Sequence, residues 1–300
     1  MEELGNGYVE KGRKNQITRA ISDVKLSELA RTINPDIAAE NLFVQPTPST
    51  LPTPIASARQ PFPTGVTDDK VMVSHKLFLD AFYNKDDYKY LTFNGGNYFQ
   101  NLNLKKFIEN LPETAKTEKF KTDIINQWLL ATHLGILDMH NCNNIMITHD
   151  TVTKEYNVIP QFDFECGNKI LDKSTAFVSN IHPKIAMFAH QAMDNPIHKN
   201  NIEFLQTDET AKTVAHEFLE RAHIVKTNNM GEIFDLQKIQ PIISKYMGLK
   251  PDKYFQITER HIIDAHTSEI KVKSVLGNLG DMACKGYCDR FNRIAEEITK

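Results

Sequence analysis

Residues 134–165 read LGILDMHNCNNIMITHDTVTKEYNVIPQFDFE, and this stretch decides the fold more than any other part of the chain. A polar loop separates an apolar helix from an apolar strand, and such loops are where a rigid scaffold presents functional groups. A second strand at residues 156–162 follows after a turn and ends at Asp163. If the two strands pair as a hairpin, the polar loop and the end of the second strand come to the same edge. Asp138 and Asn143 of the loop then lie close to Asp163.

These residue types suit phosphoryl transfer, which needs metal ions on the phosphates, a positioning group beside the attacking hydroxyl and a cation. Magnesium prefers hard oxygen ligands and keeps several waters, so one carboxylate and one amide oxygen suffice. Asp163 and Asn143 fit as ligands, with Asn144 as the alternative amide. Asp138 fits as the group that accepts or orients the hydroxyl proton, and His140 as a group that holds the loop or contacts a phosphate. The competing interpretation is a polar turn whose Asp and Asn residues serve only turn geometry.

The segments LGILDMHNCNNIMI and QFDFE resemble the catalytic and metal-binding loops of phosphatidylinositol 3- and 4-kinases, with their D-x-H-x-x-N and D-F-G motifs. They are also similar to the HipA-like kinases and to the atypical effector kinases that intracellular bacterial pathogens secrete. The resemblance implies an α+β, two-lobed, protein-kinase-like fold with ATP and Mg²⁺ as cofactors, and Mn²⁺ as the alternative metal. It implies Asp138 and His140 as catalytic residues, and Asn143 or Asn144 together with Asp163 as metal ligands.

The chain departs from the family pattern at several points. Asn144 intervenes before the apolar strand, and Glu165 stands where D-F-G kinases have glycine. The sequence has no clear Gly-x-Gly-x-x-Gly loop and no Val-Ala-x-Lys strand. The lysine that contacts the nucleotide phosphates is therefore expected to be Lys11, with Lys14 as its rival. A catalytically inactive pseudokinase, acting as a binding or scaffold module, is the alternative of another class.

Residues 1–75 are expected to form a reduced N-lobe. A short strand around residues 8–11 precedes a helix over residues 15–34, whose apolar residues recur at helical spacing. Glu28 is the acid on this helix best placed to pair with an N-terminal lysine, although a surface position is its other interpretation. Residues 39–45 predict a short strand.

Six prolines predict that residues 46–65 form one long loop. Residues 71–79, VMVSHKLFL, predict a buried strand running into a connector. This segment resembles the hinge strand of the atypical effector kinases, which makes Ser74 a candidate nucleotide-binding residue.

Residues 76–300 are expected to form a helical C-lobe that carries the catalytic loop at residues 135–147. Helical spacing predicts helices over the following ranges: 98–111, 117–134, 185–195, 210–226, 235–248 and an amphipathic one within 280–300. Cys284 and Cys288 are expected to be reduced, mostly buried thiols, because no second Cys or His pair completes a zinc set nearby.

The composition, with 41% hydrophobic and 24% charged residues and a net charge of -3, predicts a soluble globular protein and gives no reason to expect nucleic acid as a partner. No apolar run approaches the ~20 residues that span a bilayer. We expect a cytoplasmic-type protein, or one exported into a host cell as an effector. The acceptor hydroxyl is expected on a protein Ser or Thr, with an inositol lipid as the alternative. The sequence names neither an activating partner or ligand nor the oligomeric state.

Overall fold

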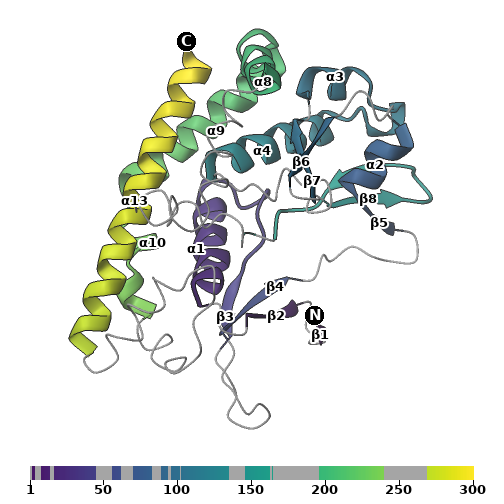
Figure 1. The fold of residues 1–300 in the computed structure, drawn as a ribbon. Helices are drawn as coiled ribbons and strands as arrows, with labels where there is room; N and C mark the ends of the chain where they lie inside the picture. The colour runs from purple at the N-terminus through teal and green to yellow at the C-terminus, as the bar shows by residue number, and fades with distance from the viewer. Residues whose placement is uncertain are drawn as a thin grey trace.

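The computed structural model describes residues 2–3, 8–13, 17–44, 56–61, 70–82, 89–93, 96–101, 103–134, 146–162, 164, 196–239 and 269–300. Its strands are β1 (Glu2–Glu3), β2 (Tyr8–Arg13), β3 (Leu42–Val44), β4 (Ala56–Pro61), β5 (Lys70–Ser74), β6 (Lys89–Phe93), β7 (Gly96–Asn101), β8 (Met146–Asp150) and β9 (Tyr156–Val158). Its helices are α1 (Ile17–Ile33), α2 (His75–Phe82), α3 (Leu104–Glu109), α4 (Glu118–Leu134), α8 (Pro196–Thr207), α9 (Glu209–Asn228), α10 (Met230–Ile233) and α13 (Glu269–Thr299), with short 3₁₀ helices at Glu113–Ala115 and Leu236–Ile239. The predicted α+β class is confirmed (Figure 1).

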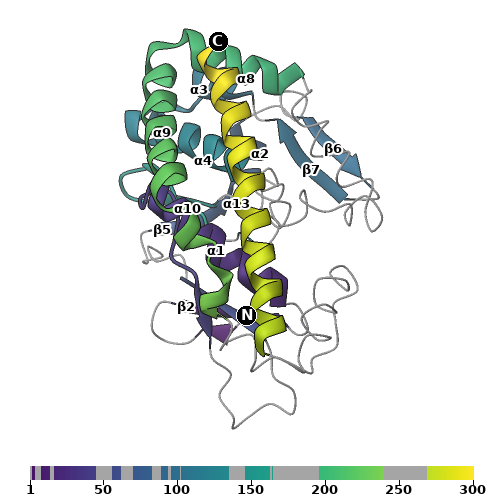
Figure 2. The same ribbon diagram turned by 90° about the vertical axis from the view of Figure 1, so that its left-hand side faces the viewer.

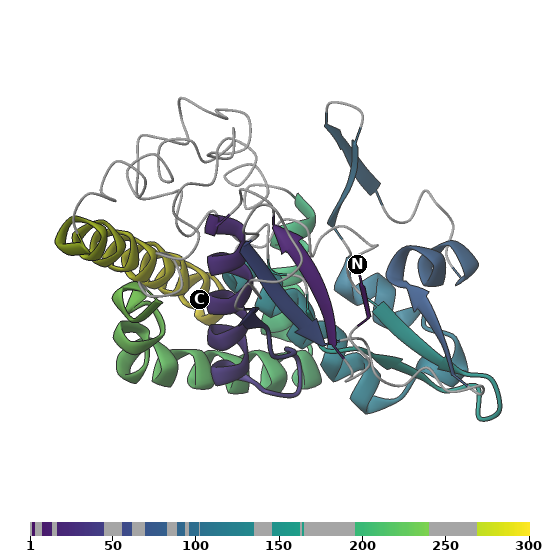
Figure 3. The same cartoon turned by 90° about the horizontal axis from the view of Figure 1, so that it is seen from below.

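The N-terminal part forms an antiparallel sheet in the order β1-β2-β4-β3, and α1 packs against it (Figure 3). The strands predicted around residues 8–11 and 39–45 are confirmed. The prediction of one long loop over residues 46–65 is wrong, because β4 lies between β2 and β3. The run ASARQ at residues 56–60 contains no proline, so each residue can donate its N–H to a neighbouring strand, and Pro61 closes the strand.

Helix α1 lies at the centre of the fold, and it contacts the N-terminal sheet as well as α4, α9 and α10 (Figure 1). Its predicted apolar face is confirmed, with Ile21, Leu29 and Ile33 each buried. Burying each such side chain contributes about 1.5–3 kcal/mol. Because neighbours cover more than one face, α1 also buries the polar residues Asp23 and Ser27.

A second antiparallel sheet has the order β5-β8-β9. The hairpin predicted from the sequence is confirmed, since Ile147 pairs with Val158 and His149 with Tyr156. The predicted strand within residues 71–79 is also confirmed, but the following connector is helix α2. Phe78 of α2 joins this sheet to α4, because its ring lies 5.1 Å from that of Tyr156 and 5.8 Å from that of Phe120.

The prediction of a single helix over residues 98–111 is wrong. Strand β7 pairs with β6 through Asn101, and only Leu104–Glu109 is helical. The aromatic pair Tyr98-Phe99 favours a strand. Asn103 then starts α3, because its side chain accepts a hydrogen bond from the Lys106 N–H at 3.1 Å.

The remaining helices build a layer along one side of the molecule (Figure 2). The helices predicted over residues 117–134 and 210–226 are confirmed as α4 and α9, and the Asp208 side chain caps α9. The C-terminal helix is longer than predicted and starts at Glu269. It passes close to the chain after α10, since a Cβ at Gly280 would meet the Phe234 carbonyl oxygen at 2.1 Å.

Buried apolar side chains of α1, α4, α9 and α13 belong to one continuous core. The division into lobes at residues 75 and 76 stays a prediction. Cys284 and Cys288 are free and half-buried, and burial raises the pKa of the Cys284 thiol to about 11. In the described part of the chain, none of the helices has the length and apolar composition needed to cross a membrane. The helix predicted over residues 185–195 lies outside the described residues, as does most of the one over 235–248.

Candidate functional site

Three segments meet at one end of the β5-β8-β9 sheet. The last residue of β5, Ser74, pairs with Met146, the first residue of β8. Ile159, just beyond β9, donates its N–H to the Met146 carbonyl at 2.9 Å. The start of β8 at Met146 and the end of β9 therefore lie at the same end of the sheet, as the hairpin predicts. The predicted approach of residues 138 and 143 to Asp163 lies outside the described residues.

The connection between α1 and β3 holds the chain that leaves β9. Gln161 donates its N–H to the Ile37 carbonyl at 2.9 Å, and its carbonyl accepts from the Ala39 N–H at 2.8 Å. These two bonds form a parallel bridge between Ala38 and Gln161. The position of residues 159–162 is therefore set by the N-terminal part of the chain as well as by the hairpin.

Two buried side chains fix the backbone on either side of Asp163. The Asn41 amide donates to the Phe162 carbonyl at 2.9 Å and to the Asp23 carbonyl at 3.2 Å. A carboxyl oxygen of Asp23 accepts the Phe164 N–H at 3.1 Å. Asp23 and Phe164 are both fully buried, and Asn41 is 3% exposed. Rigid backbone on both sides of a functional residue limits the positions that its side chain can take.

Ser27 supports this arrangement from the next turn of α1. Its hydroxyl donates to the Ala39 carbonyl at 2.6 Å and accepts the Asn41 N–H at 2.9 Å. We call Asp23, Ser27 and Asn41 the α1 clamp. Each of its members bonds to backbone, so it fixes the course of the chain.

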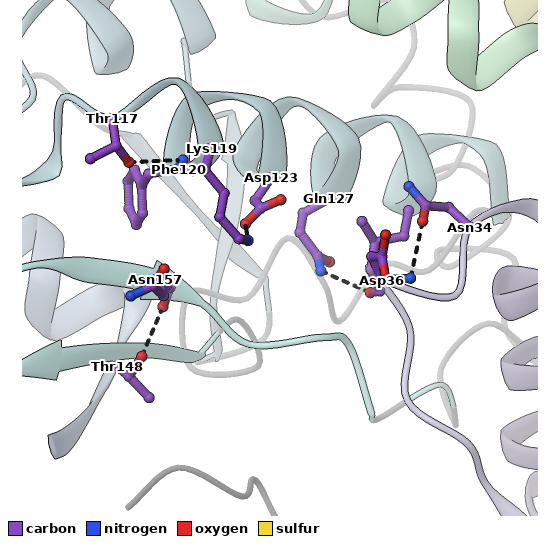
Figure 4. A network of polar contacts seen from close by, with 10 residues as sticks. Asn34, Asp36, Thr117, Lys119, Phe120, Asp123, Gln127, Thr148 and Asn157 are labelled. Carbon is purple, nitrogen blue, oxygen red and sulfur yellow. Dashed lines mark hydrogen bonds and ion pairs between the residues drawn. The ribbon is translucent and has the colours of Figure 1, made fainter.

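Helix α4, which leads into the 135–145 loop, is tied to the same connection. The Gln127 amide donates to the Ile37 carbonyl at 2.9 Å, and Figure 4 shows the Gln127 side chain reaching from α4 toward the segment that carries Asp36. The Ile37 carbonyl thus accepts both from α4 and from the chain leaving β9. The Ile37 carbonyl therefore links α4 to the chain that leaves β9, the two segments that flank the candidate site.

Two acids interact near this connection, Asp123 of α4 and Asp36 of the segment between α1 and β3. Asp123 forms an ion pair with Lys119 (Figure 4). Partial burial raises the pKa of Asp123, the Lys119 ammonium lowers it, and the nearby Asp36 raises it again. Among the described residues, no group of three or more His, Cys, Asp or Glu side chains is arranged so that it could hold a metal ion.

Six of the predicted site residues lie outside the described residues: Asp138, His140, Asn143, Asn144, Asp163 and Lys14. The other two are placed by their backbone only. Lys11 lies in β2 opposite Ala58, and Ser74 lies at the end of β5. Their roles in catalysis and in binding nucleotide and metal stay predictions.

The sequence interpretation missed Asp23 and Asn41. It considered Glu28 as the acid of the first helix, but Glu28 is half-exposed and pairs with Lys25 at 2.7 Å, in keeping with its alternative assignment to the surface. The signal in the sequence was Asp23 itself, an acid among the apolar residues of α1. A carboxyl that is buried needs hydrogen-bond partners, so its position indicates a polar contact inside the fold.

The comparisons with known proteins add no assignment, since no family model, curated protein or solved structure matches this chain. The kinase resemblance therefore rests on the residues of the 134–165 stretch. The described geometry can hold two chain segments at fixed positions beside one sheet end, and the chemistry depends on the side chains that those segments carry.

Proposed function

We propose that the chain is an atypical kinase that transfers the γ-phosphoryl group of ATP to a hydroxyl. Asp138 orients the acceptor hydroxyl, with His140 supporting it, and Asn143 or Asn144 together with Asp163 holds Mg²⁺. The bound metal neutralises charge on the transferring phosphate. A carboxylate and an amide oxygen are a donor set that magnesium accepts.

The observation that carries this proposal is the anchoring of the chain around Asp163. The α1 clamp binds the Phe162 carbonyl and the Phe164 N–H, so the backbone is fixed on both sides of the proposed metal ligand. A turn whose Asp and Asn residues served only local geometry would need no such support from a helix 140 residues away. Phosphoryl transfer does need it, because positioning is most of the catalysis.

The nucleotide side of the proposal involves the N-terminal sheet. Lys11 lies in β2, a strand that contacts α1, and is the candidate for the nucleotide phosphates. Ser74 lies where β5 reaches the sheet end that the 135–145 loop enters. The acceptor is proposed to be a protein Ser or Thr, and an inositol lipid hydroxyl is the alternative that an assay must separate.

The test measures nucleotide binding and turnover separately. A ligand at a hundredfold excess over its Kd stabilises the folded state by about 2.7 kcal/mol, so ATP with Mg²⁺ should raise the melting temperature. Transfer of labelled phosphate is then measured to the chain itself, to a mixed protein substrate and to phosphatidylinositol vesicles. We expect Asp138→Ala and Asp163→Ala to lower turnover by about a hundredfold or more.

Asp281→Ala is the matched control, because Asp281 is exposed on α13 and the same carboxylate is removed. A thermal shift without turnover would favour a nucleotide-binding pseudokinase. Absence of both the shift and turnover would refute the kinase proposal. A Lys11→Ala variant with full turnover would transfer the phosphate-binding role to Lys14.

A further inference from the structure

Arg290 is a charged residue on the buried face of the C-terminal helix. It is 8% exposed, and it shares this face of α13 with the buried rings of Tyr287 and Phe291. Burial and the charge of Arg293 lower the pKa of the Arg290 guanidinium to about 10, so the group is charged at neutral pH. A buried charge destabilises the fold unless an opposite charge compensates it.

No acid compensates this charge in the described part of the chain. The Nη1 atom of Arg290 is buried and has no hydrogen-bond partner there. Arg293, the neighbouring charge that acts on the Arg290 pKa, is itself positive. Glu297 of the same helix already pairs with Arg293 at 3.3 Å and with His198 at 3.2 Å. Arg290 therefore lacks a counterion among the described residues.

A second unpaired nitrogen belongs to His133, the penultimate residue of α4, which is fully buried. The rings of Tyr287 and Phe291 stand edge-on to the His133 ring, with centroids 5.0 and 5.1 Å away. Arg290 precedes Phe291 directly and follows Tyr287 by one helical turn, so α13 brings all three residues toward His133. Burial, together with the Arg290 charge, lowers the pKa of His133 to about 3, and the ring is neutral at physiological pH.

The bond between His133 and Tyr287 leaves the other nitrogen of the imidazole without a partner. The His133 Nε2 and the Tyr287 hydroxyl lie 2.6 Å apart, and the hydroxyl keeps its proton because burial raises its pKa well above 10. When the hydroxyl donates to Nε2, the proton of the neutral ring is on Nδ1. Nδ1 has no hydrogen-bond partner among the described residues. This part of the core then holds two donors, one of them charged, without an acceptor for either.

We propose that Arg290 and His133 form a binding site for a small carboxylate ion, with the guanidinium as the charged donor and the His133 Nδ1–H as the neutral one. A carboxylate matches the planar fork of a guanidinium, and its single negative charge balances that of Arg290. A water molecule also accepts from Nη1, but it leaves the charge uncompensated. The site uses residues of α4 and α13 only, so it is independent of the proposed kinase function.

The surroundings of the two donors limit the size and the charge of the ligand. Helix α13 packs against α4 and α9, and the ring of Phe218 from α9 lies 5.5 Å from that of His133. An acidic side chain on the surface of another protein does not reach nitrogen atoms enclosed in this way. A phosphate ion has four oxygen atoms and more than one negative charge at neutral pH, which two donors do not satisfy. Formate and acetate fit both limits.

The test compares the melting temperature of the full chain in sodium acetate with that in sodium chloride at equal ionic strength. An ion that binds only the folded state, at about tenfold above its Kd, should raise the melting temperature of wild type by about 3 °C. The rise should saturate with acetate concentration. Broadening of the carboxyl resonance of ¹³C-labelled acetate measures binding independently of stability.

Variants of two arginines on α13 assign the effect to the site. Arg290→Met should lose the acetate-specific rise and the line broadening, and in chloride it should melt close to wild type. Arg290→Lys keeps the charge without the fork and should weaken acetate binding about fivefold or more. Arg293→Met is the matched control, because it removes the same charge from a side chain that is 41% exposed and paired with Glu297. Its response to acetate should equal that of wild type.

Each outcome bears on the proposal. Equal acetate responses in wild type and Arg290→Met would overturn it, as would a wild type that melts alike in acetate and chloride and broadens no resonance. A larger Arg290-dependent rise in sodium phosphate than in acetate would overturn the assignment to a carboxylate. If Arg290→Met does not fold, Arg290→Lys decides, because an unchanged Kd for acetate in that variant would contradict the role of the guanidinium.

Discussion

The chain leaving β9 and the end of α4 flank the same candidate site, but buried polar groups hold them in different ways. At the β9 side, every member of the α1 clamp bonds to backbone, and Asp23 and Asn41 bind the residues next to Asp163. At the α4 side, the buried Nη1 atom of Arg290 has no partner among the described residues, and His133 bonds to the Tyr287 hydroxyl. The Oδ1 atom of Asn41 also lacks a partner in this part of the chain, so unpaired atoms occur on both sides. The two sides differ in what their bonds join, because the α1 clamp binds backbone groups, whereas the His133 bond joins two side chains.

This difference predicts different consequences of mutation. A backbone group stays buried when its side-chain partner is removed, so the fold then carries the free-energy cost of an unsatisfied donor or acceptor. An unsatisfied buried group already carries that cost in the native state, so its replacement by an apolar residue is tolerated. We therefore expect loss of an α1 clamp side chain to lower the free energy of unfolding strongly, and replacement of Arg290 by an apolar residue to change it little.

The largest effect is expected for Asp23→Ala. The change leaves the buried Phe164 N–H without its acceptor and opens a cavity in α1, so the free energy of unfolding should fall by about 3 kcal/mol. Asp23→Asn keeps an oxygen at the acceptor position and should lose less than half as much. Urea denaturation measures both values. Equal losses in the two variants would show that the Phe164 bond is not the main contribution of Asp23.

Asn41→Ala should have the next largest effect, a loss of about 1–2 kcal/mol in the free energy of unfolding, because the Phe162 and Asp23 carbonyls both lose a donor. Asn110→Ala is the matched control, since its amide donates to the Lys106 carbonyl at 2.8 Å from an exposed position. We expect the control to lose less than about 0.5 kcal/mol. A loss in the control as large as that in Asn41→Ala would remove the distinction between buried and exposed bonds.

The sequence predicts the parts of this site that depend on local pattern. The apolar periodicity of residues 117–134 predicts α4, and two strands separated by a short turn predict the β8–β9 hairpin, because both signals lie within a few neighbouring residues. The hairpin brings Ile159 next to Met146, and the pairing of β5 with β8 brings Ser74 to the same end of the sheet.

The contacts of the α1 clamp could not be predicted in this way. Asp23 meets Phe164 across 141 residues, and Asn41 meets Phe162 across 121. Phe164 and Phe162 take part through their backbone only, since Asp23 binds the Phe164 N–H and Asn41 binds the Phe162 carbonyl. The side chains at these two positions therefore give no sign of the contact in the sequence. The strand β4 was missed for a different reason, because flanking prolines outweighed the proline-free run at residues 56–60.

The His133 contact should give the protein a distinct dependence of stability on pH. His133 has a folded-state pKa of about 3, against 6.5 as its ordinary value, so the unfolded chain binds the proton first as pH falls. Its contribution to stability is complete above about pH 6.5 and is lost as pH falls toward 3, with a slope of at most about 1.4 kcal/mol per pH unit. The charged or titratable groups facing it from α13 are Arg290, which opposes protonation, and Tyr287, whose pKa burial raises well above 10.

The measurement compares wild type with the double variant His133→Leu, Tyr287→Phe, in which apolar groups replace both partners. Urea denaturation at several pH values between 7.5 and 5 should give a shallower decline for the double variant. Parallel declines would show that His133 does not titrate with the shifted pKa.

The smallest change in stability is expected for Arg290→Met, and this variant tests the comparison most directly. Burial lowers the pKa of the Arg290 guanidinium to about 10, which leaves it charged at neutral pH with an unpaired Nη1 atom. Removing a buried charge whose Nη1 atom has no acceptor among the described residues relieves its desolvation cost, and a methionine of similar length fills the same space. The free energy of unfolding should therefore stay within about 1 kcal/mol of wild type or rise. A loss of about 3 kcal/mol, the size expected when a paired buried charge is broken, would show that Arg290 is satisfied and that the two sides of the site are held alike.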